Sequence, residues 1–322
     1  MNRWEDIIEV QLPLPFALKI INAFLIKGKN GYTIIDTGLH IQEDVDKWEE
    51  VQSQLGFKWD EVEKIVLTHY HPDHYGLAGT LQAWTGAPVY LSETDYKHAQ
   101  LFLSDNGDMP EAMASFFSRH GLEVEFVEKI PAHLRSYHRF AEPHPSPSFI
   151  KAGDTIYLGD YEYQILHTPG HADGHLSFYD PARKWLIGGD FLLPRISPNI
   201  SLWPRCDPNP LETYLSTLRQ MKEIPVQTVF PSHGKVFHHY EKRIDTLLVH
   251  HKHRLEEMKK VLLRTKATTA YEICKQVFGE KLSIHNLRFA LSEVLAHLEY
   301  LRVQGEIQSI TKDGKVLYRI DC

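Results

Sequence analysis

Apolar residues in the first hundred positions come in short runs that are interrupted by turn residues. Such runs predict strands. They lie at 7–12, 18–26, 32–35, 62–68 and 88–92. Lys27-Gly-Lys-Asn-Gly31 predicts a turn between the second and third runs, and the stretch 75–84 has helical spacing. We therefore expect a meander followed by a strand, a loop, a helix and a strand.

The pattern changes between residues 94 and 147, where helical patches at 96–103 and 111–120 precede a loop rich in proline and histidine. We interpret 94–147 as an inserted helical lid. Runs typical of strands then resume at 149–157, 161–167, 176–179 and 185–187. A helix over 211–221 and a short strand over 228–231 restore the alternation of helix and strand that is typical of an α/β domain.

From about residue 241 the sequence is typical of charged helices, expected at 244–263, 269–277 and 286–304. It ends in two alternating runs around the turn Lys312-Asp-Gly-Lys315, which predict a hairpin. Three helices followed by a hairpin suggest a winged-helix-like domain. A length of 322 residues fits one large and one smaller domain, and we place the boundary between 1–240 and 241–322.

Composition restricts the environment and the partners. Acidic residues near the N-terminus and the lack of a long apolar stretch predict a cytoplasmic protein without a membrane segment. Cys206, Cys274 and Cys322 are odd in number and far apart, which argues against a disulfide framework or a cysteine-based zinc site. A net charge of −7 disfavours a chain-wide grip on nucleic acid but leaves room for a local basic groove.

Twenty histidines are many for this length, and four of the relevant metal-ligand residues lie together in Thr68-His-Tyr-His-Pro-Asp-His-Tyr75, directly after an apolar run. Alternate residues of an extended loop point the same way, so His69 and His71 can share one metal ion. Asp73 and His74 follow Pro72, where the loop turns into a helix, and can face a second ion. Imidazole nitrogen and carboxylate oxygen are ligands that zinc accepts. Helix capping would need Asp73 alone and would leave the histidines unexplained.

Three more predicted strands end in residues of the same kind: His171, Asp190 and His233. The two glycines before Asp190 let the backbone come close to a cluster, and its carboxylate can bridge two ions. His167 and His175 lie beside His171 in the sequence, and each is open to two interpretations, a metal ligand or a buried neighbour of one.

The order His-x-His-x-Asp-His, then His, Asp and His, resembles the metallo-beta-lactamase superfamily over about residues 7–240. The resemblance implies an α/β four-layer αββα sandwich, two mixed sheets flanked by helices with a dinuclear metal centre at one edge. It assigns His69, His71 and His171 to one ion, Asp73, His74 and His233 to the other, and Asp190 to the position between them. Asp36, in Ile35-Asp-Thr-Gly38, matches an early turn of the family whose aspartate orients ligands.

The resemblance also implies the chemistry. Two ions about 3.5–4 Å apart can hold a bridging hydroxide near neutral pH, and that hydroxide is the expected nucleophile. Asp73 is the candidate catalytic residue, since it can orient the water as well as bind metal. We expect two Zn²⁺ ions, although this ligand set also tolerates iron and manganese. A bridging Asp190 resembles glyoxalase II, thioesterases, lactonases and the RNA-cleaving branch, so a small-molecule ester, thioester or similar acyl substrate is favoured.

Candidate substrate contacts are Arg195 and Asn199, in the loop 191–203 after the bridging aspartate. A salt bridge or a loop-stabilising hydrogen bond would explain them equally well.

Two other functions stay open. Endoribonuclease activity on single-stranded RNA is one, because some family members with a C-terminal winged-helix-like domain cleave RNA. The C-terminal lysines and arginines here are mixed with glutamates, however, as on a solvated face. The other is a non-enzymatic metal sensor joined to a winged-helix DNA reader, for which the segment 283–298 offers Arg288 and His285 beside Glu293. Assembly into a homo-oligomer is compatible with either function.

Overall fold

The computed structural model describes residues 1–16, 18–104 and 107–320. Their contacts divide the chain into two compact units. The first unit consists of Met1–Ser104, Tyr137–Pro198 and Ile224–Glu241. The second consists of Asp105–Ser136, Asn199–Glu223 and Lys242–Cys322. The boundary predicted near residue 240 and the lid at 94–147 stay predictions. The contacts group part of that lid, and a second internal stretch, with the C-terminal helices.

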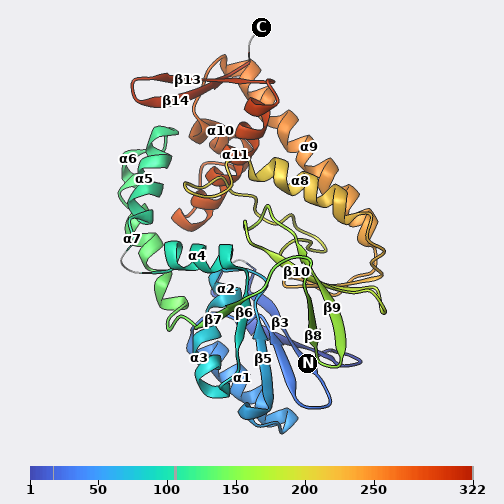
Figure 1. The fold of residues 1–322 in the computed structure, drawn as a ribbon. Coiled ribbons are helices and arrows are strands. Elements are labelled where there is room, and N and C mark those ends of the chain that lie inside the picture. The colour runs from blue at the N-terminus through green and yellow to red at the C-terminus, as the bar shows by residue number, and fades with distance from the viewer. Residues whose placement is uncertain (17, 105–106, 321–322) are drawn as a thin grey trace. The chain divides into compact units, whose positions relative to one another are not determined.

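Two sheets form the first unit (Figure 1). Within the described residues, one sheet has the order β1-β2-β3-β4-β5-β6-β7 and the other β12-β11-β10-β9-β8. The strands of the first sheet are β1 (Arg3–Trp4), β2 (Ile7–Pro13), β3 (Ile20–Lys27), β4 (Tyr32–Ile35), β5 (Val62–Val66), β6 (Val89–Leu91) and β7 (Pro147–Phe149). Those of the second are β8 (Thr155–Leu158), β9 (Tyr161–His167), β10 (Leu176–Asp180), β11 (Trp185–Gly189) and β12 (Thr228–Pro231). Each sheet contains parallel and antiparallel pairs and is therefore mixed.

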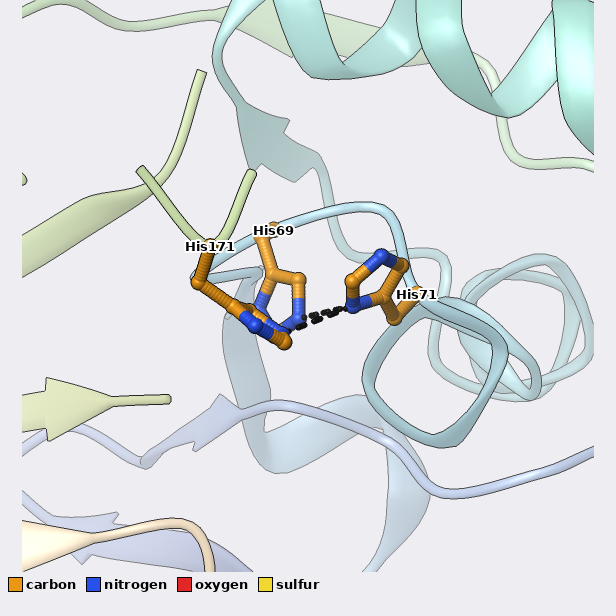
Figure 2. Close-up of side chains that lie close together, drawn as sticks. All are labelled: His69, His71 and His171. Carbon is orange, nitrogen blue, oxygen red and sulfur yellow. Dashed lines mark hydrogen bonds between the residues drawn. The ribbon is translucent and has the colours of Figure 1, made fainter. Parts of the chain in front are cut away.

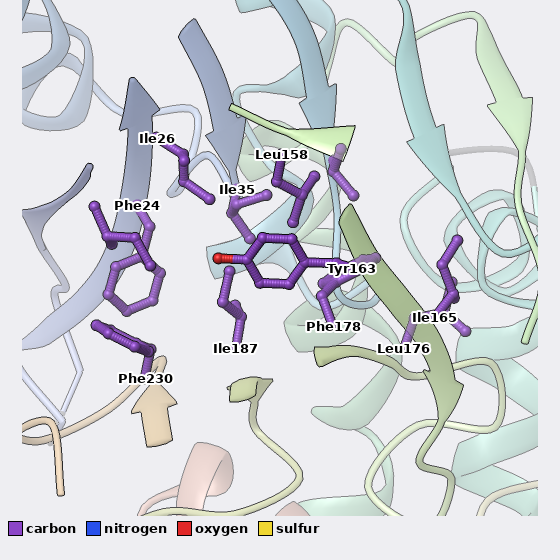
Figure 3. Close-up of a cluster of buried hydrophobic side chains, with 12 residues drawn as sticks. Phe24, Ile26, Ile35, Leu158, Tyr163, Ile165, Leu176, Phe178, Ile187 and Phe230 are labelled. Carbon is purple, nitrogen blue, oxygen red and sulfur yellow. The ribbon is translucent and has the colours of Figure 1, made fainter. Parts of the chain in front are cut away.

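The apolar core lies between the two sheets (Figure 3). Tyr163 and Ile165 are alternate residues of β9, and both are buried there, whereas Gln164 between them is exposed. Phe24 of the first sheet meets Phe230 of the second edge to face, with ring centroids 5.8 Å apart. Because side chains alternate along a strand, a register slip of one residue would turn these groups out of the core. The core therefore fixes the register of these strands.

Helices pack on the first sheet. These are α1 (Gln42–Leu55), which contacts β2, and α3 (Ala78–Thr85), which contacts β5 (Figure 1). Trp48 of α1 is fully buried, and its indole Nε1 donates to the main-chain oxygen of Thr37 at 2.9 Å. The remaining helices of this unit are the short η1 (Trp59–Glu61), α2 (Pro72–Tyr75), α4 (Glu93–Phe102) and η2 (His138–Phe140). The predicted α/β architecture of mixed sheets and helices is confirmed.

Two of the predicted elements were wrong in detail. The apolar run 149–157 is not one strand but the end of β7 and the start of β8, which lie in different sheets. The chain turns between them at Gly153, whose φ of 89° favours glycine. The helix predicted over 75–84 is interrupted at Leu77, whose φ of −88° and ψ of 3° are not helical. A side chain at the preceding Gly76 would collide with the main-chain oxygens of Phe140, Pro72 and Gly38. This close backbone approach holds α2 in place.

The second unit is helical. Its helices are α5 (Met109–Arg119), α6 (Val124–Val127), α7 (Ile130–Arg135), α8 (Pro210–Met221), α9 (Tyr240–Thr265), α10 (Ala270–Phe278) and α11 (Ile284–Val303). The predicted hairpin is confirmed as β13 (Gln308–Lys312) and β14 (Lys315–Arg319), with positive φ at Asp313 and Gly314 as a type I′ turn requires. The description as a winged helix stays a prediction. Neither Cys206 nor Cys274 forms a disulfide, and Cys322 lies outside the described residues.

Hydrogen bonds explain why residues 105–136 belong to this unit. The ring of His120, which ends α5, lies with Nδ1 3.2 Å from the hydroxyl of Tyr318 in β14. The main-chain oxygen of His120 accepts from the amide of Tyr271 in α10 at 3.1 Å. Both contacts join residues far apart in the sequence, which a pattern along the chain cannot predict. No helix in the described part of the chain is both long and apolar enough to cross a membrane.

A buried histidine pair joins α9 and α11 within the second unit. Nδ1 of His297 donates to the main-chain oxygen of Glu293 at 2.7 Å, so its Nε2 accepts from Nδ1 of His251 at 3.0 Å. Burial, together with the nearby His250 and Arg254, lowers the pKa of His251 to about 2 and that of His297 to about 4. The pair is therefore neutral in the folded protein.

The pair predicts a loss of stability in mild acid. Below pH ~6.5 the two histidines become protonated in the unfolded chain but stay neutral in the folded protein. The free energy of unfolding therefore falls as the pH falls. Replacing both residues (His251→Leu with His297→Leu) should reduce this slope by about 2 kcal/mol per pH unit between pH 6 and 5. Urea denaturation at several pH values measures it. The exposed His253 on the same helix is the control, and His253→Gln should keep the wild-type slope. If the free energy of unfolding changed equally with pH in the wild type and the double variant, the prediction would be contradicted.

Candidate metal centre

The structure brings all seven predicted ligands together at the ends of strands of the first unit. His69 and His71 lie on the loop after β5, and Asp73 and His74 lie in α2. His171 follows β9, Asp190 follows β11 and His233 follows β12. Three groups of these residues have ligand atoms within 4.8 Å of one another. The groups are His69, His71 and His171; His69, His74 and Asp190; and Asp73, His74 and His233.

Three imidazoles converge in the first cluster, formed by His69, His71 and His171 (Figure 2). Nδ1 of His71 lies 3.0 Å from Nε2 of His69 and 2.9 Å from Nε2 of His171. A proton on Nδ1 of His71 cannot make a good hydrogen bond to both of these nitrogens. The lone pairs of the three nitrogens can, however, bind one cation together. Nitrogens around a tetrahedral zinc ion are about 3.3 Å apart, since each Zn–N bond is about 2.0–2.1 Å. The nitrogens are therefore already spaced nearly as zinc requires.

The second cluster contains Asp73, His74 and His233. Nε2 of His233 lies 3.4 Å from Oδ2 of Asp73, and Nε2 of His74 lies 3.8 Å from the same oxygen. Asp190 contacts both clusters. Its Oδ1 is 3.5 Å from His233 and 3.6 Å from His74, and its Oδ2 is 3.4 Å from Nε2 of His171. One carboxylate therefore offers a separate oxygen to each cluster.

Bare polar atoms show that this donor set fits metal ions. Nε2 of His74, Nε2 of His233 and Oδ1 of Asp190 are buried and have no hydrogen-bond partner within the described residues. Leaving such atoms without a partner is costly unless something else binds them. Nitrogen and carboxylate oxygen are also the ligand atoms that zinc, iron and manganese accept. These residues can therefore hold divalent cations.

Electrostatics differs between the two clusters. Burial, together with the neighbouring histidines, lowers the pKa of His69 and of His71 well below the usual value, so both rings are neutral and can bind metal. Burial also opposes the charged form of His74 and His233. The surrounding carboxylates outweigh it, and they raise the pKa of His74 well above the usual value and that of His233 to about 10. The second cluster thus attracts positive charge, which a metal ion supplies when it displaces those protons.

Asp36 contacts the second cluster through His74 and also holds Thr68. Its Oδ2 accepts from Nδ1 of His74 at 2.8 Å and from the hydroxyl of Thr68 at 2.8 Å, and its Oδ1 accepts from the amide of Thr68 at 2.8 Å. Because Nδ1 of His74 is held in this way, Nε2 is turned toward Asp190. On the opposite side Nδ1 of His233 is 2.9 Å from the main-chain oxygen of Ile20. Each ring is thus oriented by a partner on its far nitrogen, as metal-binding histidines usually are.

Asp95 is a supporting residue that sequence reasoning missed. It is fully buried, and its carboxylate accepts from the amide of Tyr70 at 3.2 Å and from that of Gly174 at 2.8 Å. It therefore ties the loop that carries His69 and His71 to the loop that carries His171. Burial raises the pKa of Asp95 to about 8. The Ser92-x-x-Asp95 spacing is typical of a helix start, and that signal concealed its second role.

The remaining predicted residues lie elsewhere. His167 is exposed, and its Nε2 is 2.7 Å from the main-chain oxygen of Asp173. Arg195 is exposed. Nδ2 of Asn199 donates to Oε2 of Glu293 at 3.2 Å and to the main-chain oxygen of Phe289 at 3.4 Å, all within the second unit. This geometry fits the loop-stabilising interpretation of Asn199, and substrate contact by Arg195 or Asn199 stays a prediction.

Comparison with known proteins agrees with the fold and the site. Residues 18–233 match the model of the metallo-beta-lactamase superfamily, and residues 255–320 match that of the metallo-beta-lactamase-like C-terminal domain. The probable metallo-hydrolase YqjP of Bacillus subtilis is 27% identical over 98% of each chain. A crystal structure of a metallo-beta-lactamase family protein from Thermus thermophilus is 30% identical, with a TM-score of 0.86 and 99% of each chain covered.

Two relatives with named activities match parts of the chain. Hydroxyacylglutathione hydrolase GloC of Haemophilus influenzae is 29% identical over 49% of this chain and 60% of its own. Atrochrysone carboxyl ACP thioesterase of Aspergillus fumigatus is 23% identical over 79% of this chain and 47% of its own. The protein belongs to the metallo-beta-lactamase superfamily. Within that class it is a metallo-hydrolase, which confirms the prediction of an enzyme.

The contacts of Asp36 predict that it sets metal affinity without binding metal. Asp36→Ala releases the ring of His74, so affinity should fall about ten- to a hundredfold. Competition with a chromophoric chelator measures this. The control is Asp46→Asn on the exposed face of α1, which should bind metal as the wild type does. Wild-type affinity in Asp36→Ala would rule out the orienting role.

Proposed function

We propose that this protein is a dinuclear zinc hydrolase that cleaves thioester or ester bonds. The observation that carries the proposal is the position of Asp190, whose two oxygens face the two histidine clusters separately. A carboxylate in this position suits a pair of ions that share one bridging ligand. The proposed ligands are His69, His71 and His171 for one ion and Asp73, His74 and His233 for the other.

Bound metal would supply a water of lowered pKa and polarise the oxygen of the scissile carbonyl. The residues of the chain do the rest. The side chain of Asp73 is 20% exposed, against 9% for Asp190, so Asp73 is the carboxylate that a water at the site reaches more easily. We assign to it the orientation of the attacking water and the acceptance of its proton. Because His69 and His71 are neutral ligands, they would not reduce the positive charge of the first ion.

Charge and similarity favour an anionic acyl substrate. Two divalent ions carry four positive charges, and Asp36, Asp73 and Asp190 supply three negative ones, so the loaded centre is positive until the bound water loses its proton. The names of the two partial relatives, a hydroxyacylglutathione hydrolase and an acyl carrier protein thioesterase, support a thioester of an anionic carrier. A carrier of that kind would be drawn to the positive centre.

A substrate panel tests the reaction class. The zinc-loaded enzyme should hydrolyse an acyl-glutathione or acyl-pantetheine thioester, with activity that a chelator removes and zinc restores. The panel also contains an aliphatic lactone and a single-stranded RNA, and release of thiol, acid or shorter RNA is followed. No turnover of any acyl compound would reject the proposal. Metal-dependent cleavage of RNA alone, with binding that weakens steeply as salt rises, would assign the protein to the RNA-cleaving branch instead.

The role of Asp73 is tested by Asp73→Asn, which keeps the shape but removes the base. We expect kcat to fall about 10²- to 10⁴-fold, the range that general-base catalysis contributes. Zinc content is measured on the same sample, because loss of an ion would lower activity for a different reason. Asp160→Asn, on an exposed turn of the same unit, is the control and should keep full activity. A variant that keeps its zinc and its wild-type kcat would remove Asp73 from the mechanism.

A further inference from the structure

One buried histidine beside the metal centre, His175, lies outside the three ligand groups, within the part of the chain that is described. Its ring is fully buried, and its centroid lies 5.0 Å from that of His69. Nε2 of His175 accepts a hydrogen bond from the main-chain amide of Asp190 at 3.1 Å. The ring thus contacts the backbone of the residue that faces both clusters, and not its carboxylate.

Hydrogen bonds on the other side of the ring fix which nitrogen carries the proton. Since Nε2 accepts, Nδ1 must carry the hydrogen, and it lies 2.8 Å from the hydroxyl of Thr168. Thr168 in turn lies 2.8 Å from the hydroxyl of Ser177, which donates to the main-chain oxygen of Gly188 at 3.4 Å. Read in this direction, every hydroxyl donates one bond and accepts one. The chain of bonds starts at the amide of Asp190 and ends at Gly188, on either side of the same glycine.

The glycine between them makes the contact possible. Gly189 has a φ of 52°, a conformation that favours glycine, and a Cβ there would lie 2.5 Å from Nε2 of His175 and 2.9 Å from Cβ of Thr68. No side chain fits at this position without moving the ring. The Gly-Gly-Asp sequence therefore leaves the space that His175 needs to reach the amide of Asp190, although 15 residues separate His175 from Asp190.

We propose that His175 is a positioning residue that holds the backbone of Asp190 so that its carboxylate can bind both metal ions. The proposal rests on the dinuclear centre proposed above. The hydroxyls of Thr168 and Ser177 keep His175 in the tautomer that accepts from the amide. Loss of the ring would free the turn 188–190, and the carboxylate would no longer present one oxygen to each cluster. Loss of the ring would therefore lower the affinity for metal even in the absence of substrate.

Zinc titration of the metal-stripped full-length protein tests the proposal. The wild type should bind two equivalents of Zn²⁺. His175→Leu keeps the volume but loses the acceptor, and should bind at least one equivalent about tenfold or more weakly, in the range known for partners of metal ligands. His175→Gln places an amide oxygen near the position of Nε2 and should recover a large part of the affinity. Thr168→Val keeps His175 but removes the hydroxyl that bonds to its Nδ1. This variant gives a second test if His175→Leu does not fold.

The matched control is His297→Leu, which removes a fully buried, hydrogen-bonded histidine from the second unit. A merely structural role for His175 would lower the melting temperature in both leucine variants and leave zinc affinity unchanged in both. That outcome, or wild-type zinc affinity in Thr168→Val together with His175→Leu, would overturn the proposal. A wild type that binds fewer than two ions would instead contradict the dinuclear centre, and a wild type that binds two ions but cleaves no acyl compound would contradict only the substrate class.

Discussion

The arrangement depends on one energetic problem: seven polar side chains must be held together, largely out of water, and several of their ligand atoms have no hydrogen-bond partner among the described residues. Buried groups of this kind are costly. The cost is tolerated where one nitrogen of a ring is anchored by a rigid partner, as in His74 by Asp36 and in His233 by the backbone at Ile20. The anchors lie at the ends of strands whose positions the core between the two sheets sets. Cation binding then offsets the penalty at the free nitrogen.

Charge is distributed unevenly over the centre, and this has a physical reason. The first cluster contains imidazoles only, so burial keeps them neutral and their lone pairs available. The second contains Asp73 and adjoins Asp36 and Asp190. Asp36, Asp73 and Asp190 raise the pKa of His74, and Asp190 and Asp73 raise that of His233. A cation entering the second site must displace protons, whereas one entering the first need not. In the proposed dinuclear centre, binding of the second ion should therefore be more sensitive to acid than binding of the first.

Sequence alone selected the seven residues that converge in the structure because their signal is local. His69, His71, Asp73 and His74 lie within six positions, and the others follow apolar runs that end in glycine or proline. The same reasoning missed Asp95 and could not decide the role of His175, because both act through the backbone of residues distant in the chain. It joined β7 and β8 into one strand, since nothing in the pattern shows that a chain changes sheets. The grouping of α5 with the C-terminal helices likewise depends on contacts such as that between His120 and Tyr318.

Histidine burial by itself says little about function, as the two units demonstrate. His251 and His297 are as deeply buried as His69 and His175, yet they bond to each other and to a helix backbone, and neither belongs to a ligand group among the described residues. What separates the metal centre is convergence: nitrogen atoms of one ring after another point to a shared position beside a carboxylate with a bare oxygen. In a chain with twenty histidines, the useful criterion is therefore the direction of the free nitrogen and the presence of a buried acid beside it, and not the number or depth of the rings.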